Sequence, residues 1–195
     1  MSRVASIKRE TNETSIEVRF NLDGTGKEEI NTGIGFFDHM LNNFARHGLF
    51  DLNIQAKGDL HVDCHHLIED VGIVLGQAVR EAAGDKKSIK RYGSAIIPMD
   101  EALILCALDL CGRPYFVYDL KFSTPACGSF ETAMCREFFY AVSYSAAMNL
   151  HLKMMSGEND HHIIECAFKS FAKALDMATQ TDDRIESVLS TKGML

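Results

Sequence analysis

Two five-residue runs carry the side chains in this chain that are best suited to chemistry. One is HHLIE at 65–69, and the other is HHIIE at 161–165. If each run begins a helix, its first histidine and its glutamate lie four residues apart on one helix face. An imidazole and a carboxylate at that spacing can bind the same metal ion. The runs therefore predict four metal ligands, which are His65, Glu69, His161 and Glu165.

The second histidine of each run points in a different direction. His66 and His162 are each turned by about 100° around the helix axis from the histidine before them. Neither joins the same chelate easily, so each is free to reach another ion. Two such helices facing each other would form a two-metal site with crossed ligation. Duplication with a packing role could also repeat the runs, but histidine and glutamate are poor core residues unless they are paired.

The ligand types also indicate the kind of metal. Imidazole and carboxylate ligands without a thiolate favour a six-coordinate ion such as manganese over structural zinc. By position, His39 in the helical pattern GFFDHMLNNF and His151 in the strand before the second run are further candidate ligands. His47 is explained by its place near a helix C-terminus, and His61 lies in a polar loop.

The rest of the chain repeats as well. Residues 13–24 (ETSIEVRFNLDG) and 101–112 (EALILCALDLCG) share Glu, Ile, Leu and Gly at the same offsets. Both segments predict strands that end in a glycine turn. Segments 3–9 and 94–99 could add one more strand to each copy.

A helix, a short strand and the HHxIE helix follow in each copy. Phe36-Phe37 and Phe138-Phe139 each open a helical pattern, and the first pattern ends at Gly48, a plausible left-handed residue after the helix. Strands are expected near 49–57 and 149–155. Each half therefore has three strands, a helix, a strand and a second helix, which predicts an α+β fold made by internal duplication.

The predicted halves are too interdependent to be separate domains. They span approximately residues 1–85 and 93–180, a basic stretch at 84–93 links them, and a tail covers 181–195. Neither half alone holds both chelating helices. We therefore expect residues 1–195 to form a single compact unit.

Composition excludes several classes of protein. With 195 residues and 46% apolar content, the chain can bury a substantial core. A net charge of −7 argues against a nucleic-acid-binding surface. Charged residues interrupt the apolar stretches, so no membrane span is expected. The N-terminal residues lack the apolar region of a secretory signal, and the six cysteines show no CxxC spacing. We therefore expect reduced thiols in a cytoplasmic protein.

Several motifs, taken in order, are similar to those of one enzyme family. They are LDGTG at 22–26, GFFDHML at 35–41, HGLFDL at 47–52, HHLIED at 65–70, DEAL at 100–103, DLCGRPY at 109–115, HHIIE at 161–165 and STKG at 190–193. Together they closely resemble the imidazoleglycerol-phosphate dehydratases of histidine biosynthesis. The resemblance covers nearly the whole chain.

This resemblance implies a fold, an activity and an assembly. Each half would be a four-stranded mixed sheet with two helices on one face. The enzyme would use manganese, two ions per active site, to dehydrate imidazole glycerol phosphate to imidazole acetol phosphate. Copies would form trimers packed into a 24-mer, with active sites at subunit interfaces. One ion would take His39, His66, His161 and Glu165, and the other would take His65, Glu69, His151 and His162.

The resemblance also implies roles outside the metal site. A base must take a proton from the carbon next to the one that loses its hydroxyl, and this role falls to Glu13. Glu101, at the equivalent place in the second half, is a weaker candidate for a related polar role. The substrate phosphate would bind to Arg91, Arg113 and Lys192, with Ser190 nearby.

Three other classes of function remain open at this point. A dinuclear metal hydrolase could use a similar ligand set and would hydrolyse esters. A non-catalytic metal-binding or storage shell would not need Glu13, Arg91 or Lys192. A structural protein in which the HHxIE runs only pack would hold no stoichiometric metal.

Overall fold

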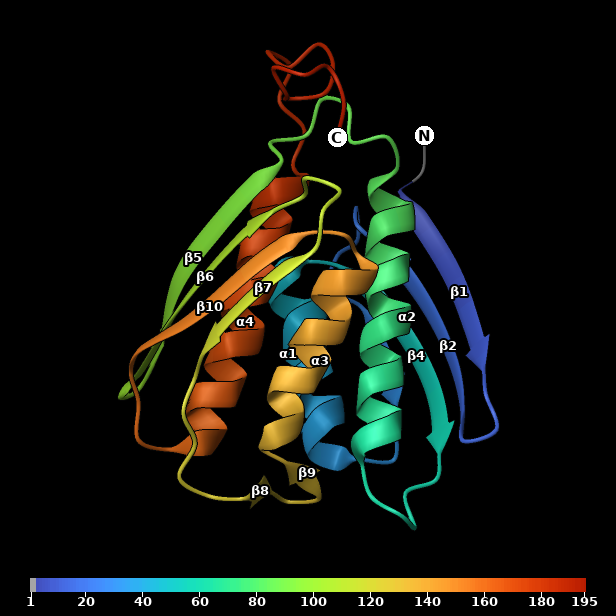
Figure 1. Cartoon of the computed structure of the whole chain (residues 1–195), viewed down its shortest axis with the longest axis vertical. Helices are drawn as coiled ribbons and strands as arrows, with labels where there is room; N and C mark the ends of the chain where they lie inside the picture. The colour runs from blue at the N-terminus through green and yellow to red at the C-terminus, as the bar shows by residue number, and fades with distance from the viewer. Residues whose placement is uncertain (1–2) are drawn as a thin grey trace.

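In the computed structural model, which describes residues 3–195, four α-helices lie between two four-stranded β-sheets (Figure 1). The strands of the first sheet, in spatial order, are β1 (Val4–Glu10), β2 (Thr14–Asn21), β4 (Asp51–Gly58) and β3 (Glu28–Asn31). Those of the second are β5 (Tyr92–Met99), β6 (Ala102–Asp109), β10 (Asn149–Ser156) and β7 (Tyr115–Asp119). Both sheets are mixed, since their last pair is parallel and the others are antiparallel.

The helices fill the space between the sheets. They are α1 (Gly35–Gly48), α2 (His65–Ala83), α3 (Ala133–Ser145) and α4 (Asp160–Thr179). α2 packs on β1 and β2, α4 packs on β5 and β6, and the helices pair as α2 with α3 and α1 with α4. A small hairpin of β8 (Ala126–Cys127) and β9 (Phe130–Glu131) precedes α3. The predicted α+β class, with two similar halves, is confirmed.

The strand registers of the two halves correspond residue by residue. Arg9 pairs with Ile16 across β1 and β2, and Ile97 pairs with Ile104 across β5 and β6. Strand residues in β1–β2 and β5–β6 whose numbers differ by 88 therefore occupy equivalent places. The two halves can be compared position by position.

The core forms where apolar side chains of the sheets meet those of the helices. β2 alternates buried and exposed residues, so that Ile16, Val18 and Phe20 all point toward α2 and its neighbours. Between the helices, the rings of Phe138 and Phe168 stack with centroids 5.0 Å apart. This packing fixes the helices relative to one another.

The outward faces of the two sheets differ in character. On the first sheet, Arg19 lies opposite Asn53, and Glu17 lies opposite Gln55. On the second sheet the outward residues are mostly apolar, namely Ile96, Leu103, Leu105, Ala107 and Val117. Ile96 is 53% exposed. Only the second sheet therefore presents an apolar outer face.

All four helices begin at the same end of the molecule, at the bottom of Figure 1. The segment after α4 lies at the opposite end, beside the connection from α2 to β5. The HHxIE runs, which open α2 and α4, are consequently at one end, and the C-terminal residues are at the other. No helix within residues 3–195 is long and apolar enough to cross a membrane.

Two helix boundaries differ from the sequence expectations. Gly48 is the last residue of α1, and the left-handed residue is Leu49, with φ 59°. Gly48 is needed for space instead, because a Cβ there would lie 2.1 Å from the ring of Phe50. α3 begins at Ala133, ahead of the aromatic pair at 138–139, and no side chain caps its first turn. The aromatic pattern therefore marked the middle of this helix and not its start.

Candidate metal and substrate site

Side chains just before the HHxIE runs accept hydrogen bonds from the first backbone N–H groups of both helices. The Oδ1 atom of Asp63 accepts a hydrogen bond from the backbone N–H of His65 at 2.8 Å. In α4, Asn159 Oδ1 accepts from the N–H of His161 at 3.0 Å. Such caps satisfy backbone donors that have no partner within the helix. Each run therefore has the helical spacing predicted from the sequence.

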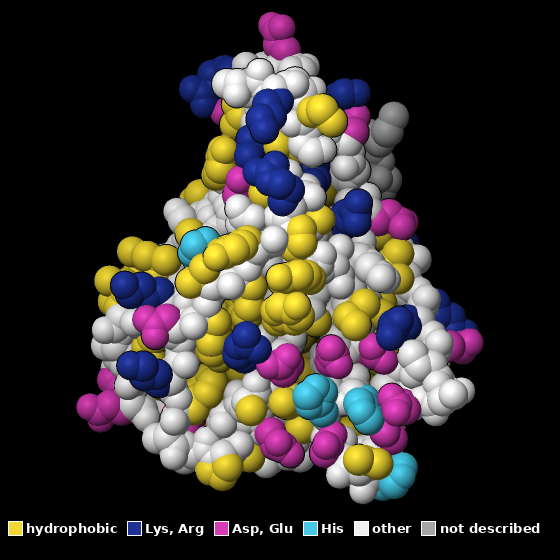
Figure 2. Space-filling model, viewed as in Figure 1, with side chains coloured by type: hydrophobic (Ala, Val, Ile, Leu, Met, Phe, Trp, Pro, Cys, Tyr) yellow, Lys and Arg dark blue, Asp and Glu magenta, His cyan; other side chains and the backbone are white. Residues whose placement is uncertain are grey.

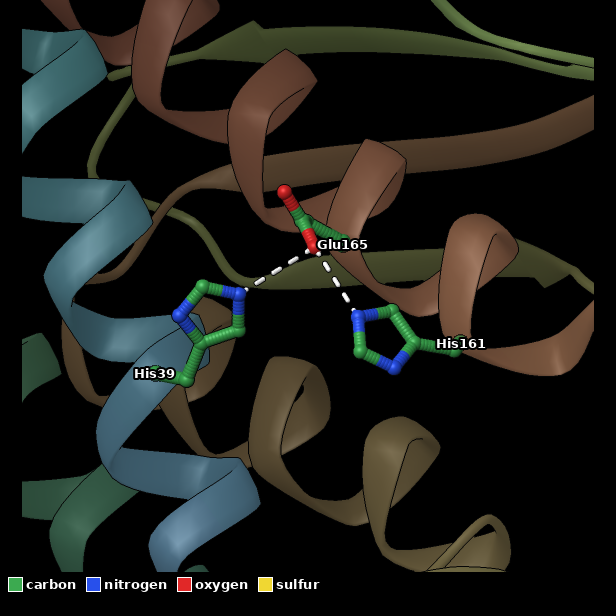
Figure 3. Close-up of side chains that lie close together, drawn as sticks. All are labelled: His39, His161 and Glu165. Carbon is green, nitrogen blue, oxygen red and sulfur yellow. Dashed lines mark hydrogen bonds and ion pairs between the residues drawn. The ribbon is translucent and has the colours of Figure 1, made fainter.

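Three predicted ligands from α1 and α4 converge on one point (Figure 3). Glu165 Oε2 lies 3.3 Å from His39 Nε2 and 3.1 Å from His161 Nε2. Ligands about 2.2 Å from one ion, at right angles to each other, are about 3 Å apart. Two imidazoles and a carboxylate at these distances fit one borderline divalent ion. That an ion binds there stays a prediction.

The carboxylate of this cluster is held from behind. The Glu165 side chain is only 7% exposed, and Lys169 Nζ lies 2.6 Å from its Oε1. Burial acts to raise the pKa of Glu165, but the hydrogen bond and charge of Lys169, with smaller effects of His161 and His39, outweigh it, so this pKa lies below its usual value. The carboxylate is therefore ionised at neutral pH, and Lys169 leaves Oε2 directed at the two histidines.

His66 belongs to a different group in the same chain. Its Nδ1 lies 3.0 Å from Asp59 Oδ2 and 3.7 Å from Glu13 Oε2. The hydrogen bond to Asp59 raises the pKa of His66. An ionised carboxylate can only accept, so Nδ1 carries the proton and Nε2 keeps the lone pair that a metal requires. The structure thus brings Glu13 beside His66, but does not join His66 to the cluster of Glu165.

His162 is held in a similar way by a different residue. Its Nδ1 lies 2.8 Å from Glu101 Oε2, and Glu101 Oε1 accepts from the N–H of Asn159 at 2.8 Å. The bond from His162, followed by that from Asn159, lowers the pKa of Glu101 to about 2. Glu101 is the counterpart of Glu13, and its polar contact is with His162. In the first half Asp59 takes this role, and Glu13 is left with a side chain that is 56% exposed.

The ligands predicted for the second ion do not all meet within one chain. His65 Nε2 and Glu69 Oε2 lie on one helix face, 3.9 Å apart. His151 lies on the outer face of the second sheet, between Ala107 of β6 and Val117 of β7. Figure 2 shows histidines beside acidic side chains near the end where α2 begins. One chain brings together His65 and Glu69, but not His151.

The four residues predicted to bind phosphate line one pocket of about 780 Å³, together with other residues of 184–195. They are Arg91, Arg113, Ser190 and Lys192. The pocket lies at the end of the molecule opposite the HHxIE runs, and Figure 2 shows lysine and arginine side chains gathered over that end. Within residues 3–195, neither Arg113 nor Lys192 forms an ion pair.

Arg91 is different, because its guanidinium already has partners. Its Nε and Nη2 donate to the two oxygens of Asp109 at 2.7 and 3.0 Å, and its Nη1 donates to the carbonyl of Leu189 at 2.7 Å. The hydrogen bonds to Asp109 raise the pKa of Arg91. Arg91 therefore ties the C-terminal segment to the end of β6. A phosphate that binds to Arg91 would share the guanidinium that already makes these contacts.

The sequence did not indicate every residue that supports these groups. Lys169 lies four residues after Glu165 on a helix, a spacing that predicts an ion pair, so this contact could have been found. Asp59 lies in the loop after β4, where no periodicity indicates which residue it will meet. Its contact with His66 depends on the path of that loop.

The chain is similar to known proteins both in sequence and in fold. The sequence model of one family, described as imidazoleglycerol-phosphate dehydratase, matches residues 32–175. The imidazoleglycerol-phosphate dehydratase of Acetivibrio thermocellus is 59% identical over 195 residues, which is 100% of both chains. That of Geobacter sulfurreducens is 53% identical, again over 100% of both chains.

Two solved structures with the same description have a similar fold. The crystal structure of the Staphylococcus aureus enzyme matches with a TM-score of 0.83 and 38% identity, covering 92% of this chain and 99% of that one. The structure of the Pyrococcus furiosus enzyme gives a TM-score of 0.82 and 39% identity, covering 97% and 100%.

Proposed function

Because this chain belongs to the imidazoleglycerol-phosphate dehydratase family, and so is a hydro-lyase of histidine biosynthesis, we propose that it converts imidazole glycerol phosphate to imidazole acetol phosphate with manganese. The observation that carries the proposal is the convergence of His39, His161 and Glu165 from helices of both halves. A duplicated fold has no packing reason to aim three metal-binding side chains at one point.

The number of candidate ligands supports two manganese ions per active site. The first would be held by the converging cluster together with His66, and the second by His65, Glu69, His151 and His162. Neutral imidazoles and ionised carboxylates suit manganese at neutral pH. The carboxylates bound to Nδ1 of His66 and His162 support the assignment, because a metal ion would then meet Nε2 of each ring; Asp100 Oδ2 lies 3.7 Å from this nitrogen in His162.

The reaction breaks two bonds on neighbouring carbons. The C–O bond next to the imidazole ring breaks and the hydroxyl leaves as water, while the adjacent carbon loses a proton. The resulting enol becomes the ketone when the ring-side carbon gains a proton, so that water is the net loss. When bound, the metal ions supply Lewis-acid stabilisation for the electrons of the ring. Glu13 would take the proton, and its place 3.7 Å from His66 supports that role.

The phosphate would be held by the basic pocket at the other end of the chain. Arg113 and Lys192 are exposed there and offer donors to an anion. Ser190 adds a hydroxyl, and Arg91 fixes the segment that carries both Ser190 and Lys192. Anchoring the phosphate orients the two carbons of the substrate toward the base.

A complete active site then requires more than one chain. α4 has 20 residues, which makes it about 30 Å long; the metal cluster lies at its first two turns and the phosphate pocket lies beyond its other end. A substrate of three carbons, one ring and one phosphate is far shorter than that. The HHxIE end of one copy must therefore meet the phosphate pocket and His151 of another.

The outer face of the second sheet suits such a contact. His151 lies there among Ala107, Val117 and Leu105, so a copy that covers the apolar residues also approaches this histidine. Exposed apolar surface of this kind is typical of interfaces between subunits. We therefore propose a homo-oligomer of trimers assembled into a 24-mer. A cytoplasmic location is proposed too, since all six cysteines are free thiols.

The test combines two measurements on the purified full chain. Elemental analysis after desalting should give about two manganese ions per chain, and incubation with imidazole glycerol phosphate should yield the ketone without release of phosphate. Inorganic phosphate as the product would instead indicate a dinuclear hydrolase. Two metal ions with neither product would indicate a storage shell, and no bound metal would contradict the proposed site.

A further inference from the structure

A buried carboxylate next to the metal-ligand candidates contacts the hairpin that carries Glu13. Asp70 follows Glu69 on α2, and its side chain is 11% exposed. Its Oδ1 accepts from Arg9 Nε at 2.8 Å, and its Oδ2 accepts from the hydroxyl of Thr14. Arg9 belongs to β1 and Thr14 to β2. One carboxylate therefore ties the ligand-bearing helix to both strands of the hairpin.

The hydrogen bonds continue from Thr14 to the backbone of Glu13. The hydroxyls of Thr14 and Thr11 lie 3.1 Å apart. The Thr11 hydroxyl oxygen accepts from the N–H of Glu13 at 3.1 Å and from that of Thr14 at 2.9 Å. A backbone bond of 2.9 Å from Thr11 N–H to the carbonyl of Thr14 closes the turn. The position of Glu13 above α2 is thereby set through its backbone.

The second half lacks this network at the equivalent positions. Cys166 follows Glu165 as Asp70 follows Glu69, and the register relates Thr14 to Ala102 and Arg9 to Ile97. There the Cys166 thiol donates to the carbonyl of Ile97 at 2.7 Å. Cys166 and Ala102 are buried, and Ile97 packs partly buried against the core. The equivalent hairpin, β5–β6, thus packs on the equivalent helix, α4, without an ion pair at these positions.

The difference between the two halves indicates that the network is not needed for the hairpin to pack on the helix. An ion pair that is only partly buried, with Arg9 39% and Asp70 11% exposed, adds little to the stability of a fold, because taking charges out of water costs about as much as their attraction returns. A satisfied polar network does specify position. The network occurs only in the half that carries Glu13. In the other half, Glu101 is fixed directly by His162 and the N–H of Asn159.

We propose that Asp70, acting with Arg9 and Thr14, is the residue that positions Glu13 for proton transfer. The inference rests on the proposed function, in which Glu13 is the base. The Glu13 carboxylate is largely exposed and has no contact as short as the one that holds Glu101. Its placement therefore depends on the turn beneath it, and a shift of about 1 Å in a reacting group can cost about 100-fold in rate.

Two variants of the full chain test this role. Asp70→Asn keeps the shape of the side chain but removes its charge. The triple variant Arg9→Ile, Thr14→Ala, Asp70→Cys copies into the first half the residues that already pack in the second. Either one remains informative if the other is poorly soluble. Both are made in the wild-type chain and in Glu13→Gln.

The expected result is a loss confined to turnover. In the wild-type background, kcat should fall by about 10- to 100-fold, while KM, manganese per chain and assembly size stay within about twofold. In the Glu13→Gln background, the same changes should alter kcat by less than about twofold, because the group they position is already absent.

Asp51→Asn is the matched control. Asp51 organises another turn of the same sheet by accepting from the N–H groups of Thr25 at 2.8 Å and Lys27 at 3.1 Å. Loss of these bonds should lower stability but leave kcat within about twofold. A similar loss of kcat in Asp51→Asn would attribute the Asp70 result to general loosening of the sheet and overturn the inference.

Three other outcomes would overturn it. Wild-type kcat in both Asp70 variants, with Glu13→Gln inactive, would refute the positioning role alone. Equal losses in both backgrounds would mean that Asp70 acts through the metal site and not through Glu13. Wild-type kcat in Glu13→Gln would refute the base assignment itself, and with it this inference.

Discussion

His151 and Glu165 are predicted to serve the same active site, yet they lie far apart in one chain. From His151 to the end of β10 at Ser156 the strand runs for about 16 Å. His151 is on the outer face of this sheet, whereas α4, which carries Glu165, packs on its inner face. If both side chains bind metal in one active site, they must come from different copies.

This separation predicts that two inactive variants restore each other. His151→Asn and Glu165→Gln should each lose at least about 100-fold in activity, since even the partners behind metal ligands cost 10- to 100-fold when removed. In mixed assemblies with equal amounts of both, one chain must supply an intact Glu165 and another an intact His151. Each condition is met half the time, so about one quarter of the sites should be complete.

The matched control places both substitutions in one chain. When His151→Asn/Glu165→Gln is mixed with the wild type, a site shared between copies is again complete in about one quarter of cases. A site contained in one chain would behave differently. It would give about one half of wild-type activity in this control, and no recovery when the two single variants are mixed.

Co-expression with two different affinity tags and tandem purification would supply the mixed assemblies. Activity per chain is then measured at saturating manganese and substrate. Recovery near one quarter in both mixtures is the expected result. No recovery with the two single variants, together with one half of wild-type activity in the control mixture, would refute the shared site. It would also refute the reasoning from the strand and helix lengths.

Other predictions concern single residues. Glu69→Gln and Glu165→Gln should each weaken one of the two ions more than the other; unchanged metal content in both, by elemental analysis, contradicts the ligand sets. Arg113→Ala should mainly raise KM in steady-state kinetics, and a fall in kcat with KM unchanged would count against phosphate binding. The N–H of Thr25 lowers the pKa of Asp51, so this carboxylate stabilises the fold above its ordinary pKa and loses that effect as the pH falls. The urea midpoint of Asp51→Asn should accordingly drop less than that of the wild type between about pH 5 and about pH 3, and parallel curves would oppose this. Cys127 is the one partly exposed cysteine among five buried ones; burial raises its pKa too, but it raises the pKa of fully buried Cys135 to about 12. Maleimide should therefore label Cys127 first, as peptide mass mapping would reveal.

Much of the fold could be predicted because the two halves repeat one pattern. The HHxIE spacing predicted where α2 and α4 carry their paired side chains, and the shared offsets of 13–24 and 101–112 predicted equivalent strands. Periodicity is a local property, so it indicates elements well. It failed at the start of α3, where no capping side chain marks the first turn.

The site was less predictable, because its contacts depend on how elements are arranged in space. The spacing of His161 and Glu165 predicted their contact, but nothing local indicated that His39 would join them. The outward direction of His151 required the register of β10 against β6 and β7. The contrast between Asp70 and Cys166 depends on the strand register, which relates the residues of the two halves to one another.

The unequal outer faces of the two sheets bear on how growth of an assembly can end. If both halves had kept the same surface, a face that adheres to a copy would occur on both sides of every chain, and addition could continue without limit into fibres. Here Arg19, Asn53 and their neighbours make one side hydrophilic, while Leu105 and Val117 keep the other apolar. If the apolar face is the one that binds a copy, as proposed, a stack of sheet upon sheet ends after a single contact.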